Sequence, residues 1–192
     1  MYIVGADTLG EMVLETAREL GVEILGFVDD VSPEPEFLGI PIVGGTTWLL
    51  ERAERDEGIT AFVAIGGNDG RARVTRRLAK ARARLPNLIH PRAWVAASAR
   101  FGAGNLVMAQ AYVGTKVVLG DGNLVFPGVC LGHHNTVGDF TFLAPGVSVG
   151  GRATIGDYAK LGMNTAVDAD AAVCSGFMCP PLTRVGGCDD AR

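Results

Sequence analysis

Two adjacent histidines, His133 and His134, are the residues of this chain best suited to proton transfer. An unperturbed imidazole has a pKa of about 6.5, so it is mostly neutral at pH 7 and can accept a proton from a reacting group. The pair follows Gly132, in a segment where packing needs no imidazole. His133 is therefore a candidate general base, although two solvated surface histidines would give the same pattern.

A second group of candidate residues lies near the N-terminus, in a loop that runs from Gly5 to Gly10. This loop follows a short apolar stretch and precedes a helical pattern, the setting in which backbone amides bind phosphate. Asp29 follows at roughly the distance where dinucleotide-binding folds keep the carboxylate that binds the ribose. Asp7 replaces the middle glycine of the dinucleotide pattern, which disfavours NAD.

Another glycine-containing loop, Gly66 to Asp69, precedes a strongly basic helical segment. Arg71, near the start of that segment, is positioned to meet a phosphate. The simpler interpretation of the segment is a solvated helix face.

Metal and thiol chemistry are not indicated by the sequence. The remaining histidine, His90, lies before the repeat described below, and no third ligand stands at a suitable spacing. The cysteines lack CxxC spacing, so we expect reduced, packed thiols at all four positions. These positions are Cys130, Cys174, Cys179 and Cys188.

The elements that must position the histidines follow from a repeat of six residues. Every sixth residue from Val95 to Val173 is apolar, and the residue after it is often glycine. A period of six fits neither a helix nor a simple strand, so it predicts short strands joined by tight corners, with glycine relieving the backbone at each turn. Three such hexads per coil form a parallel β-helix.

Stacked coils place residues 18 positions apart side by side. We therefore expect Gly151 beside His133, and Lys116 and Arg152 on either side of His134. Two cations would favour the neutral form of His134 and attract an anion such as a phosphate. Basic side chains solvated on the face of a coil are the alternative.

The first 85 residues predict a different architecture, a small α/β unit with ligands at the carboxyl ends of its strands. A segment with two prolines, residues 85–92, is the expected boundary. Strands are expected at residues 2–4, 24–28 and 59–65, and helices at 11–20, 46–55 and 68–84, the second of them capped by Thr46 or Thr47.

Composition narrows the class of function further. The net charge is −4 and the sequence pI is about 5.4, which argue against a nucleic-acid partner or an anionic membrane surface. No basic leader and no apolar stretch of about 18 residues is present, so membrane insertion is not expected. We expect a cytoplasmic protein.

These features together resemble the sialic-acid O-acetyltransferase (NeuD/PglD-like) family of hexapeptide-repeat sugar acetyltransferases. The resemblance extends from Tyr2 to about Asp170. The segments that carry it are residues 2–6 (YIVGA), 26–30 (GFVDD), 64–68 (AIGGN), 87–91 (NLIHP) and 132–140, where Gly-His leads into Val-Gly-Asp-Phe.

The resemblance implies a Rossmann-like unit at 1–85 that binds a nucleotide sugar, a left-handed parallel β-helix at 93–178 and an irregular tail at 179–192. It also implies a homotrimer with acetyl-CoA, the acyl donor, in the groove between neighbouring subunits. His133 matches the general base of the family. Similar proteins often have an acidic residue next, where this chain has His134, so we expect Asn135, Asp139 or a residue of the next subunit to orient His133.

The predicted function is acetyl-CoA-dependent N-acetylation of a nucleotide-linked amino sugar. Two alternatives stay open: O-acetylation of a sugar hydroxyl, and a noncatalytic solenoid that binds nucleotide sugars, which the altered first loop and the break in the repeat after Val173 favour. The predicted site residues are His133, Asp139 and His134 for catalysis; Gly151, Arg152, Lys116 and Gly162 for acetyl-CoA; and Gly5, Asp7, Leu9, Gly10, Asp29, Asp30, Gly67 and Asn68 for the nucleotide sugar.

Overall fold

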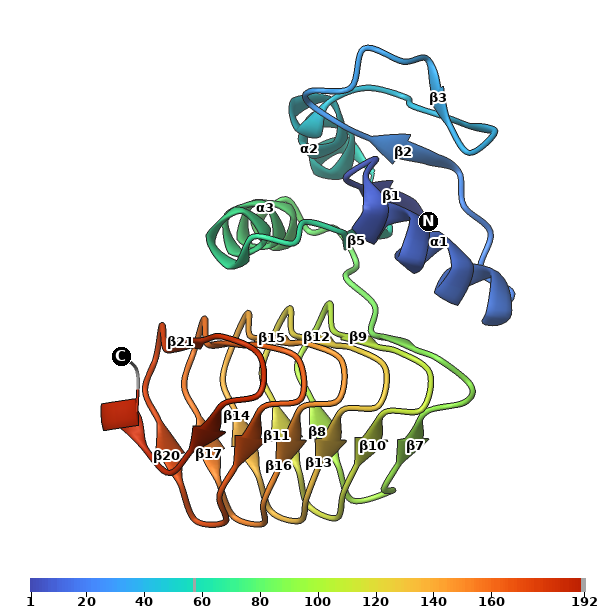
Figure 1. Cartoon of the computed structure of the whole chain (residues 1–192). Helices are drawn as coiled ribbons and strands as arrows, with labels where there is room; N and C mark the ends of the chain where they lie inside the picture. Colours follow the sequence, from blue (N-terminus) through green and yellow to red (C-terminus); the bar gives the residue numbers. More distant parts are fainter. Residues whose placement is uncertain (57, 191–192) are drawn as a thin grey trace. The chain divides into compact units, whose positions relative to one another are not determined.

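The computed structural model describes residues 1–56 and 58–190, and the chain forms two compact units, Met1–Leu88 and Ile89–Arg192 (Figure 1). The first unit is an α/β fold and the second is a parallel β-solenoid, as the sequence predicts. Among the described residues, no helix is long and apolar enough to cross a membrane.

The α/β unit contains a three-stranded parallel sheet with the order β2-β1-β5, and all three strands are buried. A short antiparallel pair, β3 and β4, follows the second strand. The elements in chain order are β1 (Tyr2–Val4), α1 (Thr8–Glu19), β2 (Gly26–Val28), β3 (Glu36–Phe37), β4 (Ile40–Pro41), α2 (Thr46–Arg55), β5 (Ala61–Val63) and α3 (Asn68–Lys80).

Two predicted helix boundaries in this unit are wrong, for local reasons. Helix α1 begins at Thr8 rather than at residue 11, because the Asp7 side chain caps it. Helix α3 ends at Lys80 rather than at residue 84, because Arg82 has a left-handed backbone (φ 63°) and Arg84 forms a parallel bridge with Thr60.

The solenoid consists of two-residue strands in three parallel sheets of six, five and six strands. Each strand pairs with the strand three places further along the chain, and the paired residues are 18 positions apart. Its strands are β6 (Leu88–Ile89), β7 (Trp94–Val95), β8 (Arg100–Phe101), β9 (Leu106–Val107), β10 (Tyr112–Val113), β11 (Val118–Leu119), β12 (Leu124–Val125), β13 (Cys130–Leu131), β14 (Thr136–Val137), β15 (Phe142–Leu143), β16 (Ser148–Val149), β17 (Thr154–Ile155), β18 (Lys160–Leu161), β19 (Ala166–Val167), β20 (Ala172–Val173), β21 (Met178–Cys179) and β22 (Arg184–Val185).

The hexad repeat has a simple structural basis. The second residue of a strand points into the coil, so Val113, Leu131 and Val149 are buried. The glycine that follows does not turn the chain by a left-handed conformation, as the sequence suggested. It permits close packing instead, because a Cβ at Gly150 would lie 2.5 Å from the backbone nitrogen of Ala169 in the next coil. The left-handed residues recur every six positions, two places further on; they include Lys116, His134, Arg152 and Asp170.

The predicted irregular tail is also wrong for residues 179–185. Strand β21 pairs with β18, and β22 pairs with β19 in the same 18-residue register. The inward positions are filled by Cys179, a small apolar side chain, and by Val185, which is fully buried. The repeat therefore continues after Val173 for two more strands.

A disulfide joins Cys174 to Cys188 in this last coil, contrary to the expected reduced thiols. Cys188 begins a short 3-10 helix, Cys188–Asp190, after β22. The disulfide closes a segment with a sequence separation of 14, so it ties the short helix after β22 to the corner that follows β20. Cys130 and Cys179 are free.

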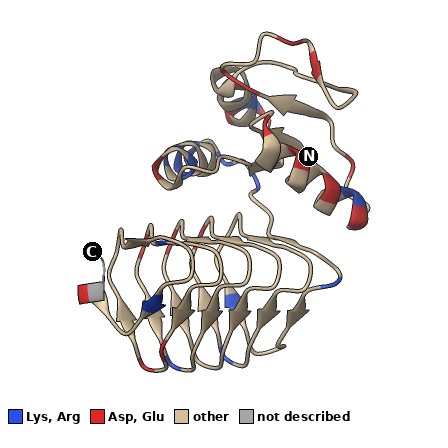
Figure 2. Cartoon of the chain, viewed as in Figure 1, with Lys and Arg blue, Asp and Glu red and all other residues tan. Residues whose placement is uncertain are grey.

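Charged side chains are distributed unevenly within the chain. Figure 2 shows Lys and Arg gathered along α3, whereas the strands of the solenoid carry few charges. The solenoid faces are therefore largely neutral, and its charged groups lie mainly at the corners.

Candidate active site

His133 and His134 lie at the corner between β13 and β14. His134 has a left-handed backbone (φ 61°), and its N–H donates to the Thr115 carbonyl at 2.8 Å. The His133 carbonyl accepts from the Arg152 N–H at 2.9 Å. Hydrogen bonds to the coils on both sides thus fix the backbone of the corner, while both imidazoles are exposed.

Gly151 lies against the imidazole of His133, which confirms the predicted stacking. A Cβ at Gly151 would stand 2.5 Å from both Cε1 and Nε2 of His133. The equivalent positions in the two neighbouring coils are His133 itself and Ala169. The backbone at this position of the repeat therefore accepts residues with a side chain. The ring itself is what requires glycine here.

The two imidazoles contact each other through their Nδ1 atoms, which are 3.2 Å apart. Their rings are nearly perpendicular, with an interplanar angle of 83°. Because Nδ1 of His133 is engaged in this contact, Nε2 is the nitrogen that remains to meet a substrate.

Asp170 is a member of this corner that the sequence analysis missed. It stands 18 positions after Arg152, whose Nε and Nη2 donate to its two carboxylate oxygens at 2.6 and 2.7 Å. The hydrogen bond from Arg152 holds the pKa of Asp170 below its usual value, and the nearby His133 contributes in the same direction. The 18-residue spacing that predicted Gly151 would have found this pair.

The ion pair changes the electrostatics predicted for the corner. Lys116, His134, Arg152 and Asp170 occupy equivalent left-handed positions in successive coils. The charge of Arg152 is compensated by Asp170, which raises the pKa of the guanidinium through their hydrogen bond. The expected anion-attracting patch therefore has a weaker field than two uncompensated cations would produce.

Asp139 is not brought to His133 and lies instead at the next corner along the coil. Its Oδ1 accepts the Asp121 N–H at 2.8 Å, and its own N–H donates to Asp157 Oδ1 at 2.7 Å. These aspartates, 18 positions apart, form a ladder that binds the backbone of successive coils. Asp139 therefore has a structural role, because it bonds neighbouring coils to one another. The expectation that it orients His133 is wrong. Asn135 is buried and donates through Nδ2 to the Gly150 carbonyl at 2.6 Å.

Gly162 lies at a third corner, after β18, and lines a cavity of about 510 Å³ in the last coils. Phe142, Met178 and Pro180 make this lining mostly apolar, and the Lys160 ammonium lies 5.3 Å from the centre of the Phe142 ring. Within one chain, the solenoid thus places Gly162 at a different corner from Gly151, Arg152 and Lys116.

The first predicted phosphate loop is closed by its own side chain. Asp7 Oδ1 accepts the N–H groups of Leu9 and Gly10 at 2.9 and 3.3 Å, so the amides that would bind a phosphate are occupied. Leu9 is buried. Gly5 has φ 110°, and a Cβ there would lie 2.6 Å from the Ala64 carbonyl oxygen, which shows that this glycine is needed for close packing.

Asp29 and Asp30 likewise bind the backbone of their own unit. The Asp29 carboxylate accepts from the N–H groups of Ala6, Val31 and Ser32, each at 2.8 Å. Partial burial opposes its charge, but these three hydrogen bonds prevail and hold its pKa below the usual value. Asp30 accepts both the N–H and the hydroxyl of Thr46 at 2.6 Å, so Asp30 rather than a threonine side chain caps α2.

The second glycine loop is organised by Arg71, whose side chain is 1% exposed. Its guanidinium donates to the Ile65 carbonyl at 2.9 Å and to Asn68 Oδ1 at 2.8 Å. Burial lowers its pKa to about 10, which leaves it charged at pH 7. Arg71 and Asn68 therefore hold the loop, while Gly67 is exposed at the start of α3.

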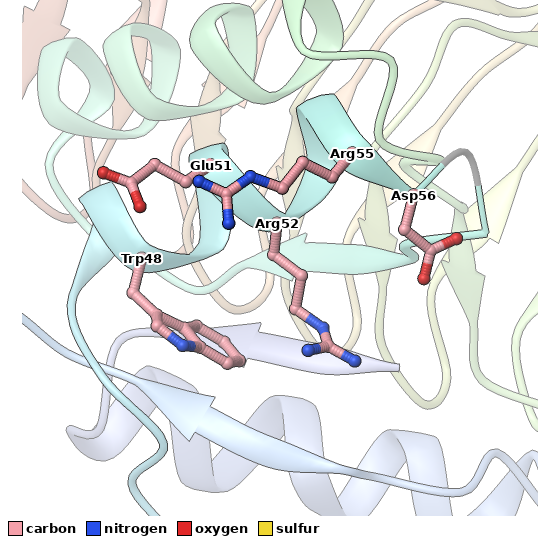
Figure 3. Close-up of a pocket in the computed structure, with 5 residues that line it drawn as sticks. All are labelled: Trp48, Glu51, Arg52, Arg55 and Asp56. Atoms are coloured by element: carbon pink, nitrogen blue, oxygen red, sulfur yellow. The ribbon is translucent and has the colours of Figure 1, made fainter.

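A cavity of about 250 Å³ beside α2 was not foreseen from the sequence (Figure 3). Trp48 and Arg52 point to the same side of the helix, with the guanidinium 5.7 Å from the indole centre. Arg55 is accompanied by Glu51 and Asp56, so the charges around this cavity balance. It contains none of the predicted site residues.

No cluster of three or more His, Cys, Asp or Glu side chains suited to a metal ion occurs in residues 1–56 and 58–190. The His133 corner brings together an exposed imidazole, a backbone glycine and the Arg152–Asp170 ion pair.

Comparison with known proteins adds a family and several solved structures. Residues 1–78 match the family model described as the PglD N-terminal domain. No curated protein matches the sequence significantly.

Among solved structures, the acetyltransferase domain of PglB from Neisseria gonorrhoeae in complex with acetyl coenzyme A is 30% identical, with a TM-score of 0.88 over 96% of this chain and 91% of that one. PerB from Caulobacter crescentus, in complex with CoA and GDP-perosamine, is 30% identical, with a TM-score of 0.67 over 96% of this chain and 90% of that one. A variant of that GDP-perosamine N-acetyltransferase with one histidine replaced by alanine has 30% identity and a TM-score of 0.68, with the same coverage.

Proposed function

Because this chain belongs to the PglD-like family of hexapeptide-repeat sugar acetyltransferases, we propose that it transfers the acetyl group of acetyl-CoA to the amine of a nucleotide-linked amino sugar. The observation that carries the proposal is similarity over 96% of the chain to proteins crystallised with acetyl-CoA, or with CoA and GDP-perosamine. Both units of the chain are covered by that similarity, so the acyl-donor and sugar-nucleotide functions are inferred together.

His133 is the general base in this proposal. The sugar amine attacks the carbonyl carbon of the thioester, a carbon–nitrogen bond forms, and Nε2 of His133 takes the proton that the amine loses. The tetrahedral intermediate then collapses, the carbon–sulfur bond breaks, and the leaving coenzyme thiolate takes up from His133 the proton that the amine lost. No covalent bond to the protein is needed, so positioning of amine and thioester supplies a large part of the acceleration.

Gly151 provides the space for this reaction. The absence of a side chain at this position lets the His133 ring lie directly against the backbone of Gly151. We place the thioester and the adjoining pantetheine arm along this part of the solenoid, where backbone N–H groups would stabilise the oxyanion.

The acetyl-CoA residues inferred from the sequence support a homotrimer. Gly151, Arg152 and Lys116 lie at one corner of the solenoid, and Gly162 lies at another, beside the apolar cavity of the last coils. A single coenzyme contacts both sets when a second copy of the chain brings its own corner alongside. We therefore propose that each active site lies between two subunits of a trimer.

We propose that the nucleotide is not bound by the acids that the sequence analysis predicted for it. Asp7, Asp29 and Asp30 are occupied by backbone N–H groups of the α/β unit. We propose that they shape the loops at the carboxyl ends of the strands, and that the nucleotide sugar contacts the exposed backbone near Gly67.

The proposal is tested by incubating the protein with acetyl-CoA and GDP-perosamine, or a panel of other nucleotide-linked amino sugars, and identifying the product by mass and NMR. An amide product supports N-acetylation, whereas an ester product would show that the enzyme acetylates a sugar hydroxyl instead. Titration calorimetry with acetyl-CoA and the oligomeric mass are measured in parallel. A folded protein that binds nucleotide sugar but not acetyl-CoA contradicts the proposal and leaves the noncatalytic binder.

A further inference from the structure

We propose that His134 is a positioning residue that holds His133 in the tautomer with a basic Nε2. This inference rests on the proposed role of His133 as the general base. It concerns the residue that follows the base, where the family resemblance led us to expect an acidic side chain.

The contact between the two rings requires one shared proton. Two unprotonated Nδ1 atoms 3.2 Å apart repel through their lone pairs, and two N–H groups repel through their hydrogens. A favourable contact between neutral rings therefore has a proton on one Nδ1 only. When His133 is the donor, its proton is on Nδ1 and its Nε2 carries the lone pair that a general base needs.

The surrounding backbone holds the two rings in this relation. The N–H of His134 donates to Thr115 in one neighbouring coil, and the carbonyl of His133 accepts from Arg152 in the other. Gly151 supports the Cε1–Nε2 edge of the His133 ring. Nδ1 of His133 is therefore directed to His134, while Asp139, the alternative partner, is bound to the Asp121 N–H at another corner.

The same contact assists the base after proton transfer. Once Nε2 of His133 has taken the amine proton, the imidazolium still donates through Nδ1 to His134. Asp170, held by Arg152 in the neighbouring coil, adds a negative charge close to His133. His134 thus acts through His133 and need not touch the substrate.

The left-handed backbone of His134 provides a matched pair of variants. Glycine and asparagine both tolerate φ near 61°, so neither variant disturbs the corner for backbone reasons. His134→Gly removes the acceptor, whereas the side-chain oxygen of His134→Asn stands close to the position of Nδ1. A purely structural role predicts two equally active variants.

The test measures kcat and the KM for acetyl-CoA in wild type, His134→Gly, His134→Asn, His133→Ala and the double variant His133→Ala/His134→Gly. We expect His134→Gly to lower kcat about tenfold to a hundredfold with little change in KM, and His134→Asn to recover most of the loss. In the His133→Ala background, His134→Gly should have no further effect, because the residue acts through His133.

The inference is overturned if His134→Gly keeps wild-type kcat, if asparagine fails to rescue it, or if the loss persists in the His133→Ala background. Those results leave the general base itself intact. Full activity of His133→Ala is a different result, which removes the proposed base as well and so distinguishes the two failures.

Discussion

The acidic side chains in the loops of the α/β unit and the two histidines at one corner of the solenoid differ in what they bind. In the α/β unit, Asp7, Asp29 and Asp30 all bind backbone N–H groups of their own unit. At the corner between β13 and β14, His133 and His134 remain exposed, and neither is used to bind the backbone through its ring.

The difference follows from where backbone N–H groups lack partners. Helix N-termini and irregular loops leave such groups unpaired, and nearby carboxylates bind them. At the corner between β13 and β14, the backbone of the neighbouring coil supplies the acceptor, because the Thr115 carbonyl accepts the N–H of His134. The Asp139 ladder agrees with this, because an aspartate there replaces a missing backbone acceptor for Asp121. An acid beside a glycine loop is therefore weaker evidence for a ligand than an exposed imidazole on a regular coil.

The strongest test of the comparison is His133→Ala. Because a general base contributes about a hundredfold to ten-thousandfold, we expect kcat to fall by at least about a hundredfold while the fold is kept. Acetyl transfer is measured by release of free coenzyme thiol, and circular dichroism checks the fold. Wild-type turnover in a folded variant would show that the exposed imidazole is not catalytic.

The disulfide covalently ties the segment after the last strand to the coil beside it. Opening a loop of about 15 residues with Cys188→Ser should lower the free energy of unfolding by about 3 kcal/mol. Each unit has one tryptophan, so Trp94 fluorescence in a Trp48→Phe background reports urea unfolding of the solenoid alone. Cys130→Ser, at a free and exposed thiol, is the control, and an equal loss there would contradict the assignment.

Gly151→Ala keeps the His133 imidazole but changes its position, so it tests whether that position matters for turnover. The new Cβ would stand 2.5 Å from Nε2 and must displace the ring, and a displacement of about 1 Å can lower turnover on the order of a hundredfold. Stability should change little, because alanine occupies the equivalent position 169. The variant is compared with wild type by kcat and thermal unfolding; unchanged kcat would mean that the ring position is not critical.

Asp29→Asn tests the opposite side of the comparison. Loss of a charged acceptor for three N–H groups should destabilise the α/β unit by about 2 kcal/mol, followed by Trp48 fluorescence in a Trp94→Phe background. Since the folded pKa of Asp29 is lowered, its stabilisation is present above the unfolded pKa of about 4 and is lost as the pH falls through the folded value.

Wild type and Asp29→Asn should therefore converge in stability only when the pH falls below the folded pKa of Asp29, which lies below its usual value. The KM for the nucleotide sugar should stay within about twofold of wild type at pH 7. A large rise in KM with unchanged stability would mean that Asp29 binds the nucleotide sugar. Glu34→Gln, at an exposed side chain, provides the control for removing one acid.

The smallest expected effect is that of the helix cap. Asp7→Ala should lower the stability of the α/β unit by about 1 kcal/mol, whereas Asp7→Ser retains a capping oxygen and should restore most of it. Thermal unfolding followed by Trp48 fluorescence measures both. If alanine and serine behave alike, the carboxylate has a role other than capping.

The sequence predicted the fold through its regular spacing. The hexad positions located the strands of the solenoid, and the 18-residue stacking placed Gly151 beside His133. The last two strands were missed because the repeat was taken to fail after Val173, although the thiol of Cys179, at an inward position of β21, packs like a small apolar side chain.

The partners of polar side chains were less predictable, because a carboxylate can bind an amide, an arginine or a ligand. Asp7 was identified as an obstacle to phosphate but not as the cap of α1. The pairing of Cys174 with Cys188 depends on how the chain turns after β22, which no periodic pattern encodes. Asp170 was predictable in principle, because it lies 18 positions after Arg152, the spacing that relates neighbouring residues in all the coils.

The 18-residue register also fixes how the length of the solenoid can change. Removing or adding 18 consecutive residues before the His133 corner would return every strand to a sheet of the same kind, with the same side chains facing inward. The distance from that corner to the first coil can therefore change only in steps of about 4.8 Å, the spacing of paired strands. Insertions whose length is not a multiple of 18 would move the imidazole to another corner or face of the coil. The repeat therefore allows the number of coils before this corner to vary while the direction in which the base points is preserved.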